Sequence, residues 1–185
     1  MKAINITGKN NIDKMNKIGN ESYKAIRKHM MTFDETLYPN IKQLELLREI
    51  LHDVSNNNNN NVPSDEKVFE SIKSLLKSEL HHKIQGYKGQ DLKKEIHHAD
   101  SLIVITDVLT KLCESNLTCF YCKKPLVVLY KNVREPLQWT LDRIDNDLSH
   151  TRDNTCIACL KCNLQRRRMD IAKFTFTKQI KINKL

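Results

Sequence analysis

Apolar residues recur at three- and four-residue spacing in the first part of the chain. From residue 21 to about residue 54 this pattern predicts two helices, which are separated by a break at Tyr38-Pro39-Asn40. The second of them carries an apolar stripe made of Leu44, Leu46, Leu47, Ile50 and Leu51. Residues 1–20 are rich in Asn and Lys and poor in apolar side chains, so no element is expected there.

A run of asparagines at 56–61 marks a linker over residues 55–63, because such a run neither buries apolar surface nor holds a helix. The strongest helix pattern follows it, with Ser64 as the expected N-cap and an apolar stripe of Val68, Phe69, Ile72, Leu75, Leu76 and Leu80. Two glycines within residues 85–90 predict the end of this helix. Thr106 is the expected N-cap of a further short helix that carries Val108, Leu109 and Leu112.

The end of the chain is ambiguous. Residues 174–177 alternate between Phe and Thr as a strand does, yet a short helix fits the spacing as well. In either case we expect Phe174 and Phe176 to cover the small core of the C-terminal part.

Charge separates the chain into two parts. The net charge is +9, and residues 117–185 hold fourteen Lys and Arg against six Asp and Glu, which places +8 in the last third. Such an excess favours a polyanion, and nucleic acid ranks above a membrane surface. With 4 glycines and no glycine-rich phosphate loop, nucleotide-cofactor folds are disfavoured. The chain shows neither a signal peptide nor a membrane-spanning run, so we expect an intracellular protein whose 6 cysteines are thiols or metal ligands.

Two cysteine pairs predict a zinc site. Cys119 and Cys122 form one CxxC turn, and a second turn lies in Cys156-Ile157-Ala158-Cys159-Leu160-Lys161-Cys162. Two such turns supply the four thiolates of a closed tetrahedral Zn²⁺ site. Spacing alone leaves open whether Cys156 and Cys159, or Cys159 and Cys162, make the second pair. Since residues 117–170 contain few large apolar side chains, the metal is expected to supply much of the folding free energy there.

Between the cysteine pairs the chain reads Trp139-Thr140-Leu141-Asp142-Arg143-Ile144-Asp145-Asn146 and then Ser149-His150-Thr151-Arg152-Asp153-Asn154, and Cys162-Asn163 closes the second pair. This arrangement resembles the zinc-bearing branch of the HNH, or ββα-metal, endonucleases over about residues 117–170. The resemblance implies a zinc-stapled ββα module that hydrolyses DNA phosphodiester bonds. It says nothing about residues 1–116.

The resemblance also assigns residues. Asp142 matches the strand aspartate that binds the catalytic divalent ion, and Asn163 matches the asparagine that completes that site from the helix; it therefore favours Cys162 over Cys156 as a zinc ligand. Asn154 matches the asparagine that holds the turn between the strands. Oxygen ligands of this kind suit Mg²⁺ or Mn²⁺. Without the flanking cysteines, a salt-bridged or turn-capping Asp142 and a helix-capping Asn163 are the simpler interpretations.

One position departs from the family pattern. The residue after the metal-binding aspartate usually is the histidine that activates water, and here it is Arg143, which cannot act as a general base. The candidates for the base are His150, the one histidine of the module, and Asp145, which is expected two residues beyond Arg143 on the strand and therefore on the same face. Arg143 instead suits a bidentate phosphate clamp.

Further cations are candidates for contacts with the nucleic-acid backbone: Arg152, Lys161, Arg166, Arg167 and Arg168. The sequence thus predicts an α+β protein, with a helical region at 1–116 and an HNH-like zinc module with a C-terminal extension at 117–185. The predicted function is a metal-dependent endonuclease that acts on DNA, with RNA as the other possible substrate. Two alternatives are a non-catalytic zinc-stabilised nucleic-acid binder and a zinc domain for protein interaction.

Overall fold

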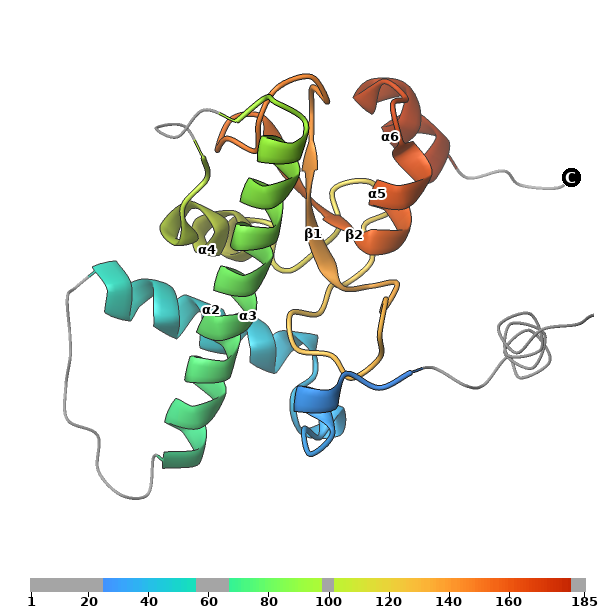
Figure 1. The fold of residues 1–185 in the computed structure, drawn as a ribbon. Helices are drawn as coiled ribbons and strands as arrows, with labels where there is room; N and C mark the ends of the chain where they lie inside the picture. Colours follow the sequence, from blue (N-terminus) through green and yellow to red (C-terminus); the bar gives the residue numbers. More distant parts are fainter. Residues whose placement is uncertain (1–24, 56–66, 98–101, 181–185) are drawn as a thin grey trace, which may run out of the picture.

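The fold is α+β, as the sequence predicts, and it places helices before a two-stranded hairpin (Figure 1). The computed structural model describes residues 25–55, 67–97 and 102–180. Its elements, in chain order, are the 3-10 helices η1 (Lys28–Met30) and η2 (Glu35–Leu37), the helices α2 (Asn40–Ser55), α3 (Lys67–Lys93) and α4 (Ile105–Glu114), the strands β1 (Trp139–Arg143) and β2 (Thr155–Cys159), and the helices α5 (Leu160–Arg166) and α6 (Ile171–Gln179).

In its described residues, 25–55, the first segment contains one α-helix where the sequence predicts two over residues 21–54. Before Pro39 the described chain forms only η1 and η2, and Asp34 caps η2 by accepting a hydrogen bond from the backbone N–H of Thr36. The first residues of this part instead pair with a distant loop, because the Arg27 N–H donates to the Lys131 carbonyl and the Val133 N–H donates to the Ala25 carbonyl. After the proline, α2 buries Leu44, Leu46, Leu47 and Ile50, which are members of the predicted stripe.

Helix α3 continues through the two glycines at which the sequence predicts its end. The helix runs from residue 67 to residue 93, so the predicted break at 85–90 is wrong. Its buried side chains extend past the glycines, with Ile84, Tyr87 and Asp91 continuing the inward face. Packing of this face outweighs the low helix propensity of glycine, about 1 kcal/mol per residue. The predicted N-cap, Ser64, lies outside the described residues.

Replacing Gly89 by alanine is expected to stabilise the protein. A Cβ atom at residue 89 or at residue 86 has nothing within 4 Å, so alanine fits and removes the entropic cost of glycine in a helix. We expect Gly89→Ala to raise the free energy of unfolding by about 0.5–1 kcal/mol, as measured by urea denaturation. A decrease would mean that the helix ends near residue 89.

One hydrophobic core joins the helical region to the hairpin. Helix α4 buries Val108, Leu109 and Leu112, and it begins at residue 105 with Val104 as its N-cap, two residues before the predicted cap. The buried cluster runs from Met30 to Phe174 and includes side chains on both sides of residue 116. The two predicted regions therefore share their core. In the described part of the chain, no helix is long and apolar enough to cross a membrane.

The hairpin and the helix that follows form a ββα module. Strands β1 and β2 are antiparallel, with Trp139 opposite Cys159 and Arg143 opposite Thr155. Figure 1 shows the hairpin between α3 on one side and α5 and α6 on the other. Two contacts tie α3 to β1: the Tyr87 hydroxyl accepts a hydrogen bond from the Leu141 N–H, and the Lys83 amine donates to the Trp139 carbonyl.

The C-terminal segment forms a helix, α6, which settles the ambiguity left by the sequence. Phe174 is buried against Tyr121, with ring centroids 4.9 Å apart. Phe176 is 67% exposed, so the expectation that both phenylalanines cover the core is wrong for Phe176. Residues two apart share a face of a strand, but on a helix they point about 200° apart.

Candidate functional site: a cysteine cluster beside a basic groove

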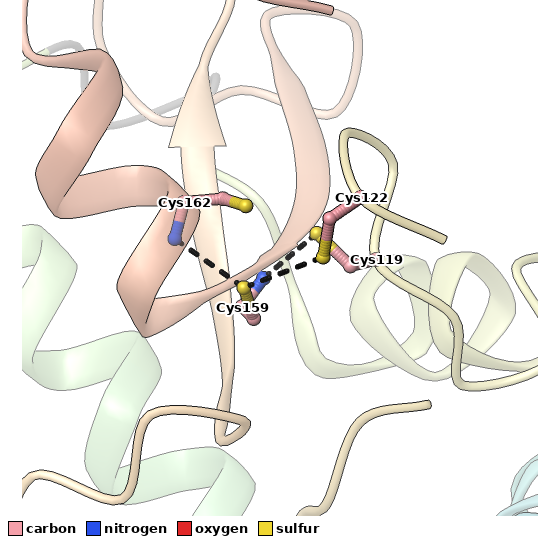
Figure 2. Close-up of side chains that lie close together, drawn as sticks. All are labelled: Cys119, Cys122, Cys159 and Cys162. Atoms are coloured by element: carbon pink, nitrogen blue, oxygen red, sulfur yellow. Dashed lines mark hydrogen bonds between the residues drawn. The ribbon is translucent and has the colours of Figure 1, made fainter. Parts of the chain in front are cut away.

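Four cysteines from two distant parts of the chain come together (Figure 2). The sulfur atoms of Cys119, Cys122, Cys159 and Cys162 all lie within 4.8 Å of one another. The Cys122 and Cys159 sulfurs are 3.9 Å apart. A tetrahedral zinc site with Zn–S bonds of about 2.3 Å places its sulfurs about 3.8 Å apart, so the cluster fits structural Zn²⁺.

The structure selects Cys162 over Cys156 for this cluster. Cys156 and Cys159 both lie on β2, three residues apart, and residues at that spacing point to opposite faces of a strand. Cys159 ends the strand and is the N-cap of α5, so the first turn of the helix brings Cys162 back toward it. The Cys156 thiol instead contacts the Tyr121 hydroxyl at 3.6 Å.

Backbone N–H groups also point at the cluster. The Cys159 N–H donates to the Cys119 sulfur and the Cys162 N–H donates to the Cys159 sulfur, each at 3.3 Å. Hydrogen bonds from the Cys159 thiol and from the backbone lower the pKa of Cys119 to about 5 and favour its thiolate. The cluster therefore has the donors that stabilise metal-bound thiolates.

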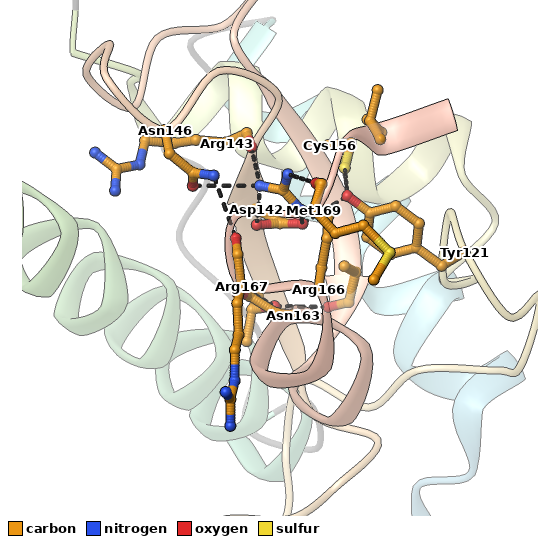
Figure 3. Close-up of polar contacts among 12 residues, drawn as sticks. Tyr121, Asp142, Arg143, Asn146, Cys156, Asn163, Arg166, Arg167 and Met169 are labelled. Atoms are coloured by element: carbon orange, nitrogen blue, oxygen red, sulfur yellow. Dashed lines mark hydrogen bonds and ion pairs between the residues drawn. The ribbon is translucent and has the colours of Figure 1, made fainter. Parts of the chain in front are cut away.

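Asp142 is buried in an ion pair with Arg166 (Figure 3). The guanidinium nitrogens Nε and Nη2 of Arg166 donate to the two carboxylate oxygens of Asp142, at 2.6 and 3.0 Å. The Tyr121 hydroxyl donates to one of these oxygens at 2.6 Å. Asp142 thus has the salt-bridged environment that was the alternative to metal binding, and both of its oxygens are engaged.

The prediction that Arg166 contacts nucleic acid is wrong. Arg166 is 2% exposed. In addition to its bonds with Asp142, its guanidinium donates to the carbonyl oxygens of Arg143 and Met169. Arg166 is the last residue of α5 and faces the hairpin, whereas Arg167 and Arg168 follow the helix and are exposed. Arg167 ends the helix with a positive φ of 51°, so the three arginines do not form one helix face toward a ligand.

Asn163 lies against the first strand. Its amide nitrogen donates to the Thr140 hydroxyl at 3.1 Å and to the Leu141 carbonyl at 3.2 Å. The N-cap of α5 is Cys159 rather than Asn163. Asn163 thus joins α5 to β1 next to Asp142. In this conformation the oxygens of Asp142 are not available as ligands for a cation, because Arg166 binds them.

His150 is buried and paired with an aspartate that the sequence does not single out. Its Nδ1 is 2.7 Å from an Asp91 carboxylate oxygen, and its backbone N–H donates to the other oxygen at 2.8 Å. Arg143 approaches the same carboxylate at 3.5 Å. Burial lowers the pKa of His150, against the opposing effect of Asp91, so the neutral imidazole is favoured at pH 7.

Asp145 and Asn154 organise the turn between the strands. The Asn154 side chain accepts from the Asp145 N–H and donates to the carbonyls of Asp145 and Ser149, which are the contacts expected of a turn-holding asparagine. Asp145 lies beyond the end of β1 and is exposed, and its carboxylate caps the Asp147 N–H. The expectation that Asp145 continues the strand on the face of Arg143 is therefore wrong.

A groove of about 580 Å³ lies between α3 and the ββα module. Asp142, Arg143, His150 and Asn163 all line it, together with the basic side chains of Lys83, Lys94 and Arg167. The other predicted cations lie elsewhere. Arg152 pairs with Asp107 at 3.5 Å, Arg168 pairs with Asp147 at 3.4 Å, and Lys161 lines a separate pocket beside the cysteine cluster.

No family model, curated protein or solved structure matches the chain.

Proposed function

We propose that this protein is an HNH-type endonuclease that hydrolyses phosphodiester bonds of DNA in the groove between α3 and the ββα module. The observation that carries the proposal is the groove itself. It is lined by four residues that are candidates for metal binding, phosphate binding or proton transfer. These are Asp142 and Arg143 from β1, His150 from the turn and Asn163 from α5. The four-cysteine cluster next to it is consistent with the structural zinc of that family.

The chain supplies a base and cations for this reaction. His150 is neutral at pH 7 because burial lowers its pKa, and its Nδ1 is engaged by Asp91, so Nε2 is the nitrogen that accepts a proton from water. Lys94 and Arg167 line the groove and place positive charge where a phosphate would lie. Arg143 contributes positive charge as well, although its Nη1 donates to the Leu148 carbonyl.

The resemblance implies Mg²⁺ or Mn²⁺ at Asp142 and Asn163, and the arrangement of these residues does not fit an ion as it stands. Arg166 engages both carboxylate oxygens of Asp142, so a cation binds there only if Arg166 leaves. The proposed chemistry therefore uses the side chains of the chain itself. Metal dependence is part of the test.

A nicking assay on supercoiled plasmid tests the proposal. The zinc-loaded protein is assayed with and without added Mg²⁺, because a strong chelator would also remove zinc. His150→Gln is expected to lower the cleavage rate by about 10²–10⁴-fold, the usual contribution of a general base. His81→Gln, the same change at an exposed α3 histidine that does not line the groove, serves as the matched control. Equal rates for the two variants would contradict the assigned base.

The ion pair between Asp142 and Arg166 favours a second candidate function, nucleic-acid binding without cleavage. A carboxylate held by an arginine stabilises the module and leaves the basic groove intact. This candidate predicts binding that weakens steeply with salt and no nicking under any metal condition. Absence of both activities would instead support a zinc domain for protein interaction.

A further inference from the structure

The residue that controls His150 comes from the helical region and lies outside the HNH-like segment. Asp91 is on α3, is 0% exposed, and lies 59 residues before His150 in the chain. It holds the histidine at two points, the ring Nδ1 and the backbone N–H. Two hydrogen bonds to one carboxylate fix both the ring orientation and the loop that carries it.

We propose that Asp91 is the positioning residue of the hydrolytic site, which holds His150 in the tautomer that leaves Nε2 free to accept a proton from water. This inference rests on the proposed endonuclease function. A carboxylate accepts a hydrogen bond only from a protonated nitrogen, so Asp91 requires the proton on Nδ1. The helical region thereby supplies part of the site.

Arg143 has a role in the same arrangement that differs from a phosphate clamp. Its Nη1 lies 3.5 Å from the Asp91 oxygen that contacts the imidazole. A buried carboxylate without a compensating charge is costly, and the guanidinium balances it. At the position where the family usually carries its histidine, this chain thus has a cation that supports an Asp91–His150 pair.

The charged and titratable groups around His150 act in opposite directions. Asp91 raises the pKa of the imidazole, whereas burial, Arg143 from β1 and Lys94 beyond the end of α3 lower it. The Tyr87 ring on α3 packs 4.6 Å from the imidazole, centroid to centroid. The net direction is downward, so the imidazole is neutral above its lowered pKa and is able to act as a base near pH 7.

The proton balance of the step is simple. Water gives a proton to Nε2 of His150 as its oxygen forms a bond to phosphorus, and the bond from phosphorus to the leaving oxygen breaks. The leaving oxygen takes a proton from solvent, and the imidazolium returns its proton to solvent. Asp91 stays a carboxylate throughout and stabilises the imidazolium.

The test compares Asp91→Asn with Glu79→Gln. Both variants replace a buried α3 carboxylate with its amide, and Glu79 pairs with Arg27 and His29 outside the groove. Two-dimensional ¹⁵N NMR of the imidazoles, with the His150 signal assigned from its absence in His150→Gln, reports the tautomer and the pKa. We expect protonated Nδ1 in the wild type and in Glu79→Gln, and a mixture of tautomers with a lower pKa in Asp91→Asn.

Cleavage provides the second measurement. Asp91→Asn is expected to lower kcat by about 10–100-fold with KM for plasmid unchanged and to move the acid limb of the pH profile down with the His150 pKa. A wild-type His150 with its proton on Nε2 would overturn the proposal, even if Asp91→Asn fails to fold. The proposal would also be overturned if Asp91→Asn keeps the proton of His150 on Nδ1 and cleaves plasmid at the wild-type rate. A wild type with protonated Nδ1 that does not nick plasmid would overturn the proposed function and, with it, the catalytic role of Asp91, while leaving its hold on the imidazole established.

Discussion

Replacing Cys162 by serine is expected to unfold the ββα module. Cys162 supplies one of the four sulfurs of the cluster, and a serine hydroxyl is a poor ligand for zinc. Structural zinc supplies about 10–16 kcal/mol in small zinc-finger peptides, and part of that is lost with one ligand. Because the module shares its core with the helices, we expect the whole chain to lose at least about 3 kcal/mol of its free energy of unfolding.

The single tryptophan gives the measurement. Trp139 is 0% exposed and lies opposite Cys159 in the hairpin, so its fluorescence reports on the module directly. Chelating zinc from the wild type and substituting Cys162→Ser are both expected to move the emission to longer wavelength and to lower the urea midpoint.

Cys156→Ser is the matched control, because Cys156 has the same sequence spacing to Cys159 but lies outside the cluster. We expect Cys156→Ser to keep one zinc per chain by metal analysis and to keep the buried tryptophan spectrum. Loss of zinc from Cys156→Ser, with zinc retained in Cys162→Ser, would assign the second cysteine pair the other way.

Local sequence patterns predict much of the fold. The CxxC spacing and the stripes of α2 and α4 depend on residues close together in the sequence, and spacing alone describes them. The turn-holding role of Asn154 came from the resemblance. The choice between Cys156 and Cys162 needed the resemblance, because both spacings are the same; the structure explains it by where β2 ends and α5 begins.

Long-range partners were beyond the sequence pattern. Asp91 looks like any surface acid of a helix, and only the fold shows that α3 continues past its glycines and brings this residue to His150. Arg166 belongs to a run of three arginines, and such a run predicts an exposed basic surface. The burial of Arg166 depends instead on how α5 packs on β1. A helical segment or a charge run gives no information on which side meets the core until its partner is placed.

Removing Arg166 is expected to be the most damaging single change among the cations of the module. Arg166→Ala leaves the Asp142 carboxylate, 4% exposed, without its ion-pair partner. Among the side chains that the structure describes, the Tyr121 hydroxyl is then its one remaining hydrogen-bond donor. Breaking a buried ion pair from one side costs about 3–5 kcal/mol. We expect a loss of that size by urea denaturation. Arg168→Ala removes a side chain that is 84% exposed and pairs with Asp147. We expect it to change the free energy of unfolding little.

Divalent ions turn the same variant into a test of the metal site that the resemblance implies. Mg²⁺ or Mn²⁺ stabilises only a protein that binds it, and in the wild type Arg166 takes both oxygens of Asp142. If Asp142 and Asn163 form a cation site once the arginine is gone, Mn²⁺ should raise the melting temperature of Arg166→Ala, and the further change Asp142→Asn should abolish that rise. A rise of equal size in the wild type would mean that the ion displaces Arg166 unaided. No rise in Arg166→Ala would leave Asp142 as the buried half of an ion pair, and a nuclease built on this groove would then depend on His150 and the surrounding cations alone.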